Sequence, residues 1–185
     1  MPLNRENFQK FEDKLFLTLQ GKNPMEVPYF ICLYHPKDEM EVMDTFSNLA
    51  LRIKNKGFTV ETFFLSKMMI EILSKFDLLS FEILDKEEQI REDLGRDLKR
   101  ILSDEMVEVL KERLRDKDVH HCAILLRYGA LWPFVHLSYI FQSIDGIVNC
   151  TIVVPYPSDI EIGYNLNEKS KDVIDHYRAE RVDLR

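Results

Sequence analysis

The sequence lacks the glycine motifs by which α/β proteins commonly bind phosphates or expose a nucleophile. Its 185 residues include only six glycines, and no GxxxxGK[ST], GxGxxG or GxSxG string is present. A P-loop needs backbone amides that converge on the phosphates, and a hydrolase elbow needs a sharp strand-to-helix turn. The sequence therefore argues against P-loop nucleotide hydrolysis, dinucleotide binding and serine-hydrolase chemistry.

Cysteine is also scarce, and no CxxC pair occurs. The three cysteines, Cys32, Cys122 and Cys150, each lie in an apolar run, which predicts small buried residues in a reducing compartment. His120 and His121 precede Cys122, but successive residues of a strand point to opposite faces, so only His120 and Cys122 share a face and could supply two ligands. A core cysteine beside a strand-edge histidine is favoured over a zinc site, so no metal and no cofactor are predicted.

Long hydrophobic runs and excess positive charge are missing as well. No apolar run approaches the roughly 18 residues that span a bilayer. The N-terminal sequence MPLNRENFQKFEDKLFL lacks the apolar core and cleavage site of a signal peptide. We therefore expect a cytoplasmic protein without membrane contact. The net charge of −7 argues against general attraction to nucleic acid.

The apolar pattern alternates between strand and helix signals. Short apolar runs predict buried strands over residues 28–36, 58–65, 119–126 and 146–154, with a possible last strand over 177–184. Helical spacing predicts helices over 5–19, 38–56, 67–75 after a Ser66 cap, 76–118 with a possible break at Ser103-Asp104, and 134–144 with Pro133 as first residue. Residues 167–172 suggest a polar turn or helix start.

This alternation predicts an α/β fold, a three-layer sandwich whose mostly parallel central sheet of about four to five strands is flanked by helices. We expect one domain over residues 1–185, with the N-terminal helix of residues 1–24 packed on it.

Ligands of open α/β sheets bind at the carboxyl ends of the strands. Three loops are expected there: His35-Pro36, the turn from Arg127 to Pro133, and Pro155-Tyr156-Pro157. The candidate partner- or ligand-binding residues are His35, Arg127, Tyr128, Trp132, His136 and Tyr156. No catalytic residue is predicted, because the paired carboxylates Glu87-Glu88 and Asp104-Glu105 lie on charged, solvated helix faces.

Two of these residues have alternative interpretations. Arg127 follows an apolar strand, and it either pairs with Asp159 or Asp145 or holds an acidic group or phosphate of a partner. Trp132 and Phe134 either pack a helix onto the sheet, or Trp132 is an exposed anchor for a partner.

A basic stretch in the long helical segment offers a third possibility. Its cations are Arg91, Arg96, Lys99, Arg100, Lys111, Arg113 and Arg115. Acidic residues are interleaved among them, so an ordinary solvated face is favoured over a DNA-binding one.

Several stretches resemble the BrxB family of bacterial BREX phage-defence systems. The stretch RYGALWPFVHLS (127–138) resembles that family's strand-to-helix turn, and YFICLYHP (29–36) resembles its first strand and turn. Ile152–Pro157 is similar to a family strand that ends in a Pro-Gly/Pro-type turn, and GYNLN (163–167) is similar to the polar Tyr-Asn segment that follows it. Pro155-Tyr156-Pro157 departs from the family, whose members often carry a glycine there.

The resemblance implies a non-enzymatic adaptor or scaffold of a BREX complex. Such a protein would bind other defence proteins, such as a PglZ-like partner, and would meet nucleic acid only through the complex. No catalytic residues are established for the family, so none carry over. The alternative is an enzyme or a nucleotide- or phosphate-binding domain that uses the strand-end loops around Arg127.

Overall fold

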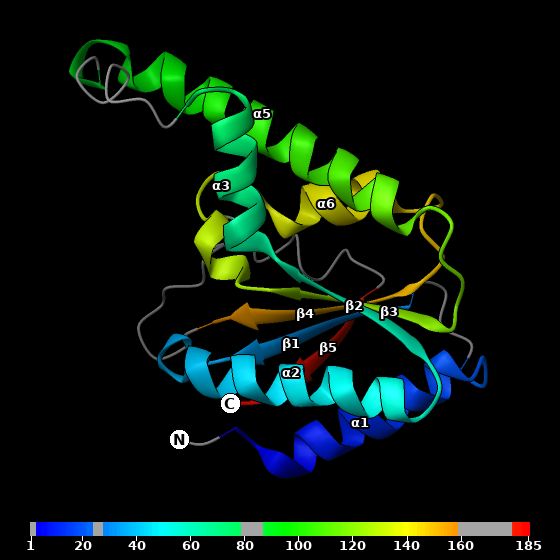
Figure 1. Ribbon diagram of the computed structural model, residues 1–185. Helices are drawn as coiled ribbons and strands as arrows, with labels where there is room; N and C mark the ends of the chain where they lie inside the picture. Colours follow the sequence, from blue (N-terminus) through cyan, green and yellow to red (C-terminus); the bar gives the residue numbers. More distant parts are fainter. Residues whose placement is uncertain (1–2, 24–27, 79–86, 159–178) are drawn as a thin grey trace.

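A five-stranded, all-parallel sheet forms the centre of the molecule (Figure 1). The computed structural model describes residues 3–23, 28–78, 87–158 and 179–185. The strands are β1 (Tyr29–Tyr34), β2 (Thr59–Phe64), β3 (His121–Leu126), β4 (Thr151–Pro157) and β5 (Glu180–Asp183), in the spatial order β2-β3-β4-β1-β5. The predicted α/β sandwich with a parallel central sheet is confirmed.

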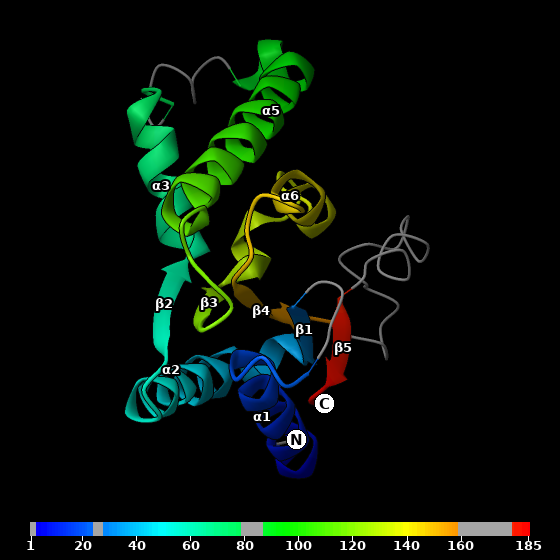
Figure 2. The ribbon, with the colours of Figure 1, turned by 90° about the vertical axis from the view of Figure 1, so that its right-hand side faces the viewer.

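Helices cover both faces of this sheet (Figure 2). One layer holds α1 (Arg5–Leu19) and α2 (Glu39–Asn55), and the other holds α3 (Leu65–Lys75), α5 (Glu87–Leu114) and α6 (Leu137–Ile144). Two short 3-10 turns, η1 (Pro36–Asp38) and η2 (Tyr128–Leu131), follow the carboxyl ends of β1 and β3.

The two helical layers explain why the central strands are continuous apolar runs. Every residue of β1, β3 and β4 is buried. Successive residues enter opposite cores: Tyr29 and Ile31 face the layer of α3, α5 and α6, whereas Phe30 and Cys32 face α1 and α2. A sheet covered on both sides leaves no polar face for the strands to display.

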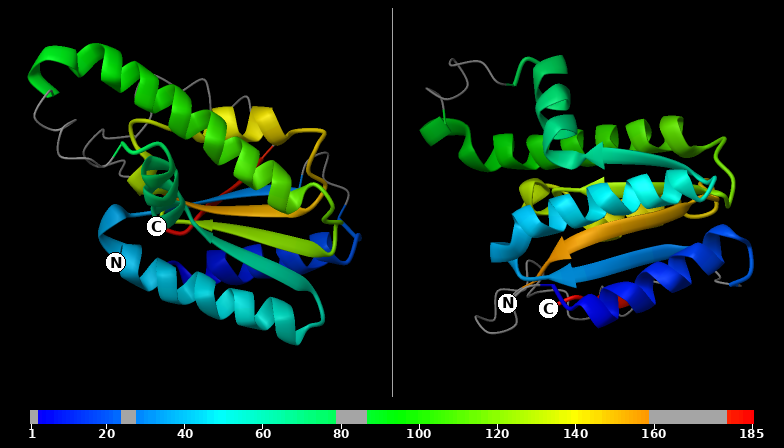
Figure 3. Two further views of the ribbon diagram at one scale, coloured as in Figure 1. Left: turned by 45° about the horizontal axis from the view of Figure 1, so that its top comes forward. Right: turned by 60° about the horizontal axis from the view of Figure 1, so that its bottom comes forward.

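Aromatic packing and a hydrogen bond to the end of the chain attach α1 to the body of the protein. Figure 3 shows this helix in the same layer as α2. The ring of Phe11 lies 5.4 Å from that of Phe30 and 6.1 Å from that of Phe46. The Asn4 amide donates to the Leu184 carbonyl at 2.9 Å, so the first helix is tied to the end of the chain.

The fourth strand departs from its predicted limits at both ends. A turn through Gly146 (φ 70°) delays its start to Thr151, and the strand continues through the prolines to Pro157. Ile152 and Ser158 donate their amides to the carbonyls of Pro28 and Tyr34, so amides at even positions face β1. The nitrogens of Pro155 and Pro157 therefore face the β3 side, where the pairing of β3 with β4 ends at Val153. No β1 ladder bond is lost, and these prolines do not end the strand.

The helix limits also differ at several places. The predicted helix over 134–144 begins at Leu137, with His136 at the cap, because the preceding residues form a separate turn in which the Phe134 and Val135 amides bond to the Leu131 carbonyl. Helix α3 starts at Leu65 directly after β2, so Ser66 lies inside it and is not the cap. Helix α5 runs through Ser103-Asp104 without a break, but it ends at Leu114 and not at residue 118. Residues 76–78, at the predicted start of this helix, form a turn.

The first helix has the predicted limits, and the last strand, Glu180–Asp183, lies within the predicted range 177–184. Residues 167–172 lie outside the described residues. All three cysteines are free and buried, and burial raises the pKa of Cys150 to about 12.

A matched pair of leucines tests the packing of α5 on the sheet. Leu110 is fully buried in the core, whereas Leu51 on α2 is 58% exposed. We expect Leu110→Ala to lower the free energy of unfolding by about 2–5 kcal/mol, and Leu51→Ala by less than about 0.5 kcal/mol. Urea denaturation followed by circular dichroism measures both, and equal losses would contradict the assigned packing.

Candidate functional site

Two of the predicted binding residues, Tyr128 and Tyr156, are parts of the core. Their side chains are 0% and 1% exposed, and their rings stack with centroids 4.9 Å apart. Tyr156 lies in strand β4 and not in a loop, which corrects its predicted position. The Tyr128 hydroxyl accepts the Leu137 amide at 2.8 Å and donates to the Val135 carbonyl at 3.2 Å. Tyr128 therefore holds the segment that leads into α6.

Arg127, at the end of β3, forms an ion pair with a residue that follows β1. Its Nε lies 3.6 Å from Glu39 Oε1, at the start of α2, and the Tyr34 hydroxyl also donates to Glu39. The predicted pairing of Arg127 with Asp145 is not formed, and Asp159 lies outside the described residues. Burial and the bond to Glu39 raise the pKa of Tyr34, so the phenol remains a donor. This network joins the ends of β1 and β3.

His35 lies half-buried at the end of β1. Its carbonyl accepts the Asp38 amide at 2.8 Å and begins the turn η1. Gly129 marks the close approach of η2 to β4, since a Cβ there would come within 3.1 Å of the Pro157 side chain. The strand-end residues thus mainly contact one another.

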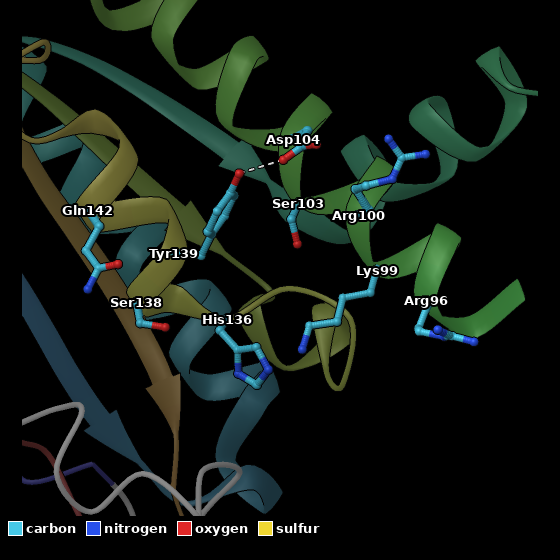
Figure 4. A pocket seen from close by; sticks show the side chains of 9 residues that line it. All are labelled: Arg96, Lys99, Arg100, Ser103, Asp104, His136, Ser138, Tyr139 and Gln142. Atoms are coloured by element: carbon cyan, nitrogen blue, oxygen red, sulfur yellow. Dashed lines mark hydrogen bonds between the residues drawn. The ribbon is translucent and has the colours of Figure 1, made fainter. Parts of the chain in front are cut away.

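A groove between α5 and α6 brings other polar side chains together (Figure 4). It has a volume of about 510 Å³ and is lined by Arg96, Lys99, Arg100, Ser103, Asp104, His136, Ser138, Tyr139 and Gln142. The first five come from α5, and the last three come from α6. We call it the α5–α6 groove.

Helical spacing places these side chains along the groove. Lys99 and Arg100 lie three and four residues after Arg96, and Ser103 lies four and three residues after these two, so the four residues share one side of α5. Leu102, Met106 and Leu110 lie in the core. The sequence of α5 therefore presents a basic strip beside the apolar stripe that fixes the helix on the sheet.

Hydrogen bonds position the groove walls. The Tyr139 hydroxyl donates to Asp104 Oδ1 at 2.5 Å, which joins α6 to α5 and raises the pKa of Tyr139 (Figure 4). The Ser103 hydroxyl donates to the Phe134 carbonyl at 3.4 Å. Of the carboxylate pair Asp104-Glu105, Glu105 is bonded to Lys75 at 2.6 Å. The side chains of Glu87-Glu88 lie outside those described.

The groove brings together residues that lie in different segments of the sequence. His136 lines it, and the Trp132 ring packs edge-on against the His136 ring at 5.8 Å. Trp132 is 40% exposed, whereas Phe134 packs against the core, so the predicted packing of this pair holds for Phe134 and the Trp132 ring remains accessible. Sequence reasoning missed Ser138, Tyr139 and Gln142, although their spacing in residues 137–144 was a usable signal.

The cations and the hydrogen-bonding side chains of the α5–α6 groove have the chemistry to bind an anion or a polar chain segment, and not a metal ion. Within the described ranges, no three His, Cys, Asp or Glu side chains are grouped as metal ligands would be. His120 is bonded to the Leu19 carbonyl at 2.7 Å and His121 to the Thr59 hydroxyl at 2.8 Å, through Nδ1 in each case. Burial lowers the pKa of His121, which favours its neutral form.

The fold and the groove together define an α/β protein with a polar groove on one helical layer. The family model for the BREX protein BrxB matches residues 61–182, about from the start of β2 to β5, and this range includes every residue of the groove. The chain belongs to the BrxB family and is a component of a BREX phage-defence system. No curated protein and no solved structure matches it.

In the part of the chain that the structure describes, no helix combines the length and the apolar character needed to cross a bilayer.

The role of the Tyr128 hydroxyl is tested against Tyr29. Tyr128→Phe leaves the amide of Leu137 and the carbonyl of Val135 without their partner, which should cost about 1–3 kcal/mol of stability. The Tyr29 hydroxyl is buried with no hydrogen-bond partner among the described residues. Tyr29→Phe should therefore be neutral or stabilising. Chemical denaturation measures both, and a neutral Tyr128→Phe would disprove the role of this hydroxyl.

The network of Tyr34, Glu39 and Arg127 predicts that removal of Glu39 lowers the free energy of unfolding more than removal of Arg127. Glu39→Ala leaves the buried Tyr34 hydroxyl without an acceptor and should cost about 1–3 kcal/mol. Arg127→Ala removes only an ion pair whose arginine is 42% exposed, and should cost less than about 1 kcal/mol. Thermal and urea unfolding of the two variants give the comparison. A larger loss for Arg127→Ala would show that the ion pair, and not the phenol, dominates.

Proposed function

We propose that this BrxB protein is a non-catalytic adaptor that binds another protein of its BREX system through the surface around the α5–α6 groove. The supporting observation is the pair of aromatic side chains on this surface. Trp132 and Tyr139 are each 40% exposed, and His136, which contacts Trp132, lines the groove with Tyr139. Tryptophan, tyrosine and arginine provide much of the binding energy in protein interfaces.

The charges beside these aromatics support the same role. Arg96, Lys99 and Arg100 lie on an exposed face of α5, while the whole chain carries a net charge of −7. A local basic strip on an acidic protein favours orientation of a complementary partner. It does not favour a long polyanion, so contact with DNA is proposed to occur only through the complex.

The alternative is a nucleotide- or phosphate-binding domain centred on Arg127. The positions of its residues give it less support. Tyr128 and Tyr156 are buried, and Arg127 pairs with Glu39. A bound phosphate would have to compete with this carboxylate for the guanidinium.

Co-purification tests the adaptor proposal. The tagged chain is expressed with the other proteins of its defence system, and recovery of each one, including a PglZ-like protein, is quantified. The wild type should recover at least one of them, and Trp132→Ala should reduce its recovery by about tenfold or more. Leu51→Ala, which removes an exposed leucine from α2 in the opposite layer, is the matched control and should have no effect.

Failure to recover any defence protein would overturn the proposal. A thermal-shift screen with nucleotides and divalent metals then tests the alternative, since a bound ligand raises the melting temperature by mass action. A shift that Arg127→Ala abolishes would assign the function to the strand ends.

A further inference from the structure

We infer that the α5–α6 groove binds a carboxylate-rich segment of a partner protein. This inference rests on the proposed adaptor function and specifies the chemistry of its partner.

The three cations that α5 contributes to the groove lie at different positions along the helix and do not converge on one point. Arg96, Lys99 and Arg100 span four residues of helix, which is about 6 Å of axial rise. In Figure 4 the side chain of Lys99 extends toward His136, while those of Arg96 and Arg100 project from other positions along α5. Separate cations at different positions match several carboxylates spaced along a chain better than a single multivalent ion.

The carboxylates beside Lys99 and Arg100 do not occupy these two cations fully, so the cations can still bind an incoming carboxylate. Arg100 lies 3.8 Å from Asp97, and its side chain is 71% exposed. Asp104 is occupied by the Tyr139 hydroxyl. No ion pair joins Lys99 to another described residue. Lys99 and Arg100 are therefore the groove cations to which an incoming carboxylate has best access.

The groove lacks the features of a phosphate cradle. None of the described residues that line it is a glycine, and the first amide of α6, that of Leu137, already donates to Tyr128. Phosphate sites commonly rely on such backbone amides. Asp104 in the wall would also repel a phosphate dianion more strongly than a single carboxylate.

The uncharged residues suit a polypeptide. Ser138 and Gln142 project from α6 on the side of the groove opposite the basic strip (Figure 4), and their hydroxyl and amide groups can bond to a peptide backbone. Trp132, beside His136, offers apolar area to side chains that separate the acidic residues. An acidic segment interrupted by apolar residues is the occupant that fits all three groups.

Fluorescence polarisation tests this inference with the full chain. The probe is a short labelled peptide of glutamates interleaved with leucine and glycine, and its matched control has glutamine at each glutamate position. The acidic peptide should bind, added salt should weaken its binding, and the glutamine peptide should bind at least about tenfold more weakly. A labelled single-stranded oligonucleotide and a nucleoside triphosphate are measured in parallel.

Charge reversal locates the site. Lys99→Glu combined with Arg100→Glu should weaken binding of the acidic peptide by about tenfold or more. Lys22→Glu combined with Lys54→Glu makes the same change in net charge at exposed positions after α1 and on α2, and should weaken it by less than about twofold. Circular dichroism verifies folding, and Lys99→Gln with Arg100→Gln replaces the reversed variant if that one unfolds.

Three results would overturn the inference: no binding of the acidic peptide, equal binding of the glutamine peptide, or tighter binding of the oligonucleotide with the same dependence on Lys99 and Arg100. These outcomes are separable from failure of the adaptor proposal. Co-purification that needs Trp132 but survives reversal of Lys99 and Arg100 would retain the adaptor and reject an acidic partner segment.

Discussion

The burial of the central strands on both faces is the constraint on which the rest of the structure depends. Parallel strands whose two faces are apolar need a helical layer on each side. Helices α1 and α2 supply one layer, and α3, α5 and α6 supply the other (Figure 2). The core therefore positions α5 and α6 side by side on the same face, where polar residues outside their apolar stripes line a common groove.

Tyr128 connects this core to the groove. Its ring stacks on Tyr156 of β4, and its hydroxyl bonds to backbone groups of Val135 and Leu137. These contacts set where α6 begins and hence where His136 and Tyr139 lie. The sequence suggested Tyr128 as a surface contact, but its side chain is buried and its hydroxyl positions the backbone that leads into α6. A tyrosine can do this because its ring is apolar and its hydroxyl can bond to buried backbone groups. The side chains that line the groove, such as His136 and Tyr139, follow a few residues later in the chain.

Much of the fold followed from local patterns in the chain. The apolar runs around Cys32, Cys122 and Val153 predicted strands because only a sheet covered on both sides buries such runs. The limits near proline and glycine were less predictable. Pro155 and Pro157 continue β4, since their nitrogens face the side on which pairing has ended, and this depends on register. The start of α6 depends on contacts of Tyr128 with residues seven and nine positions later.

The sequence by itself determined the α/β architecture, the buried cysteines and the resemblance to the BrxB family, because each of these depends on residue order and local periodicity. Only the tertiary structure decided which polar residues act together. Arg127 meets Glu39 because β3 and β1 flank β4. Lys99 and His136, far apart in sequence, line one groove because both helices pack on one face of the sheet. Side-chain partnerships across a sheet depend on strand order, which local patterns do not encode.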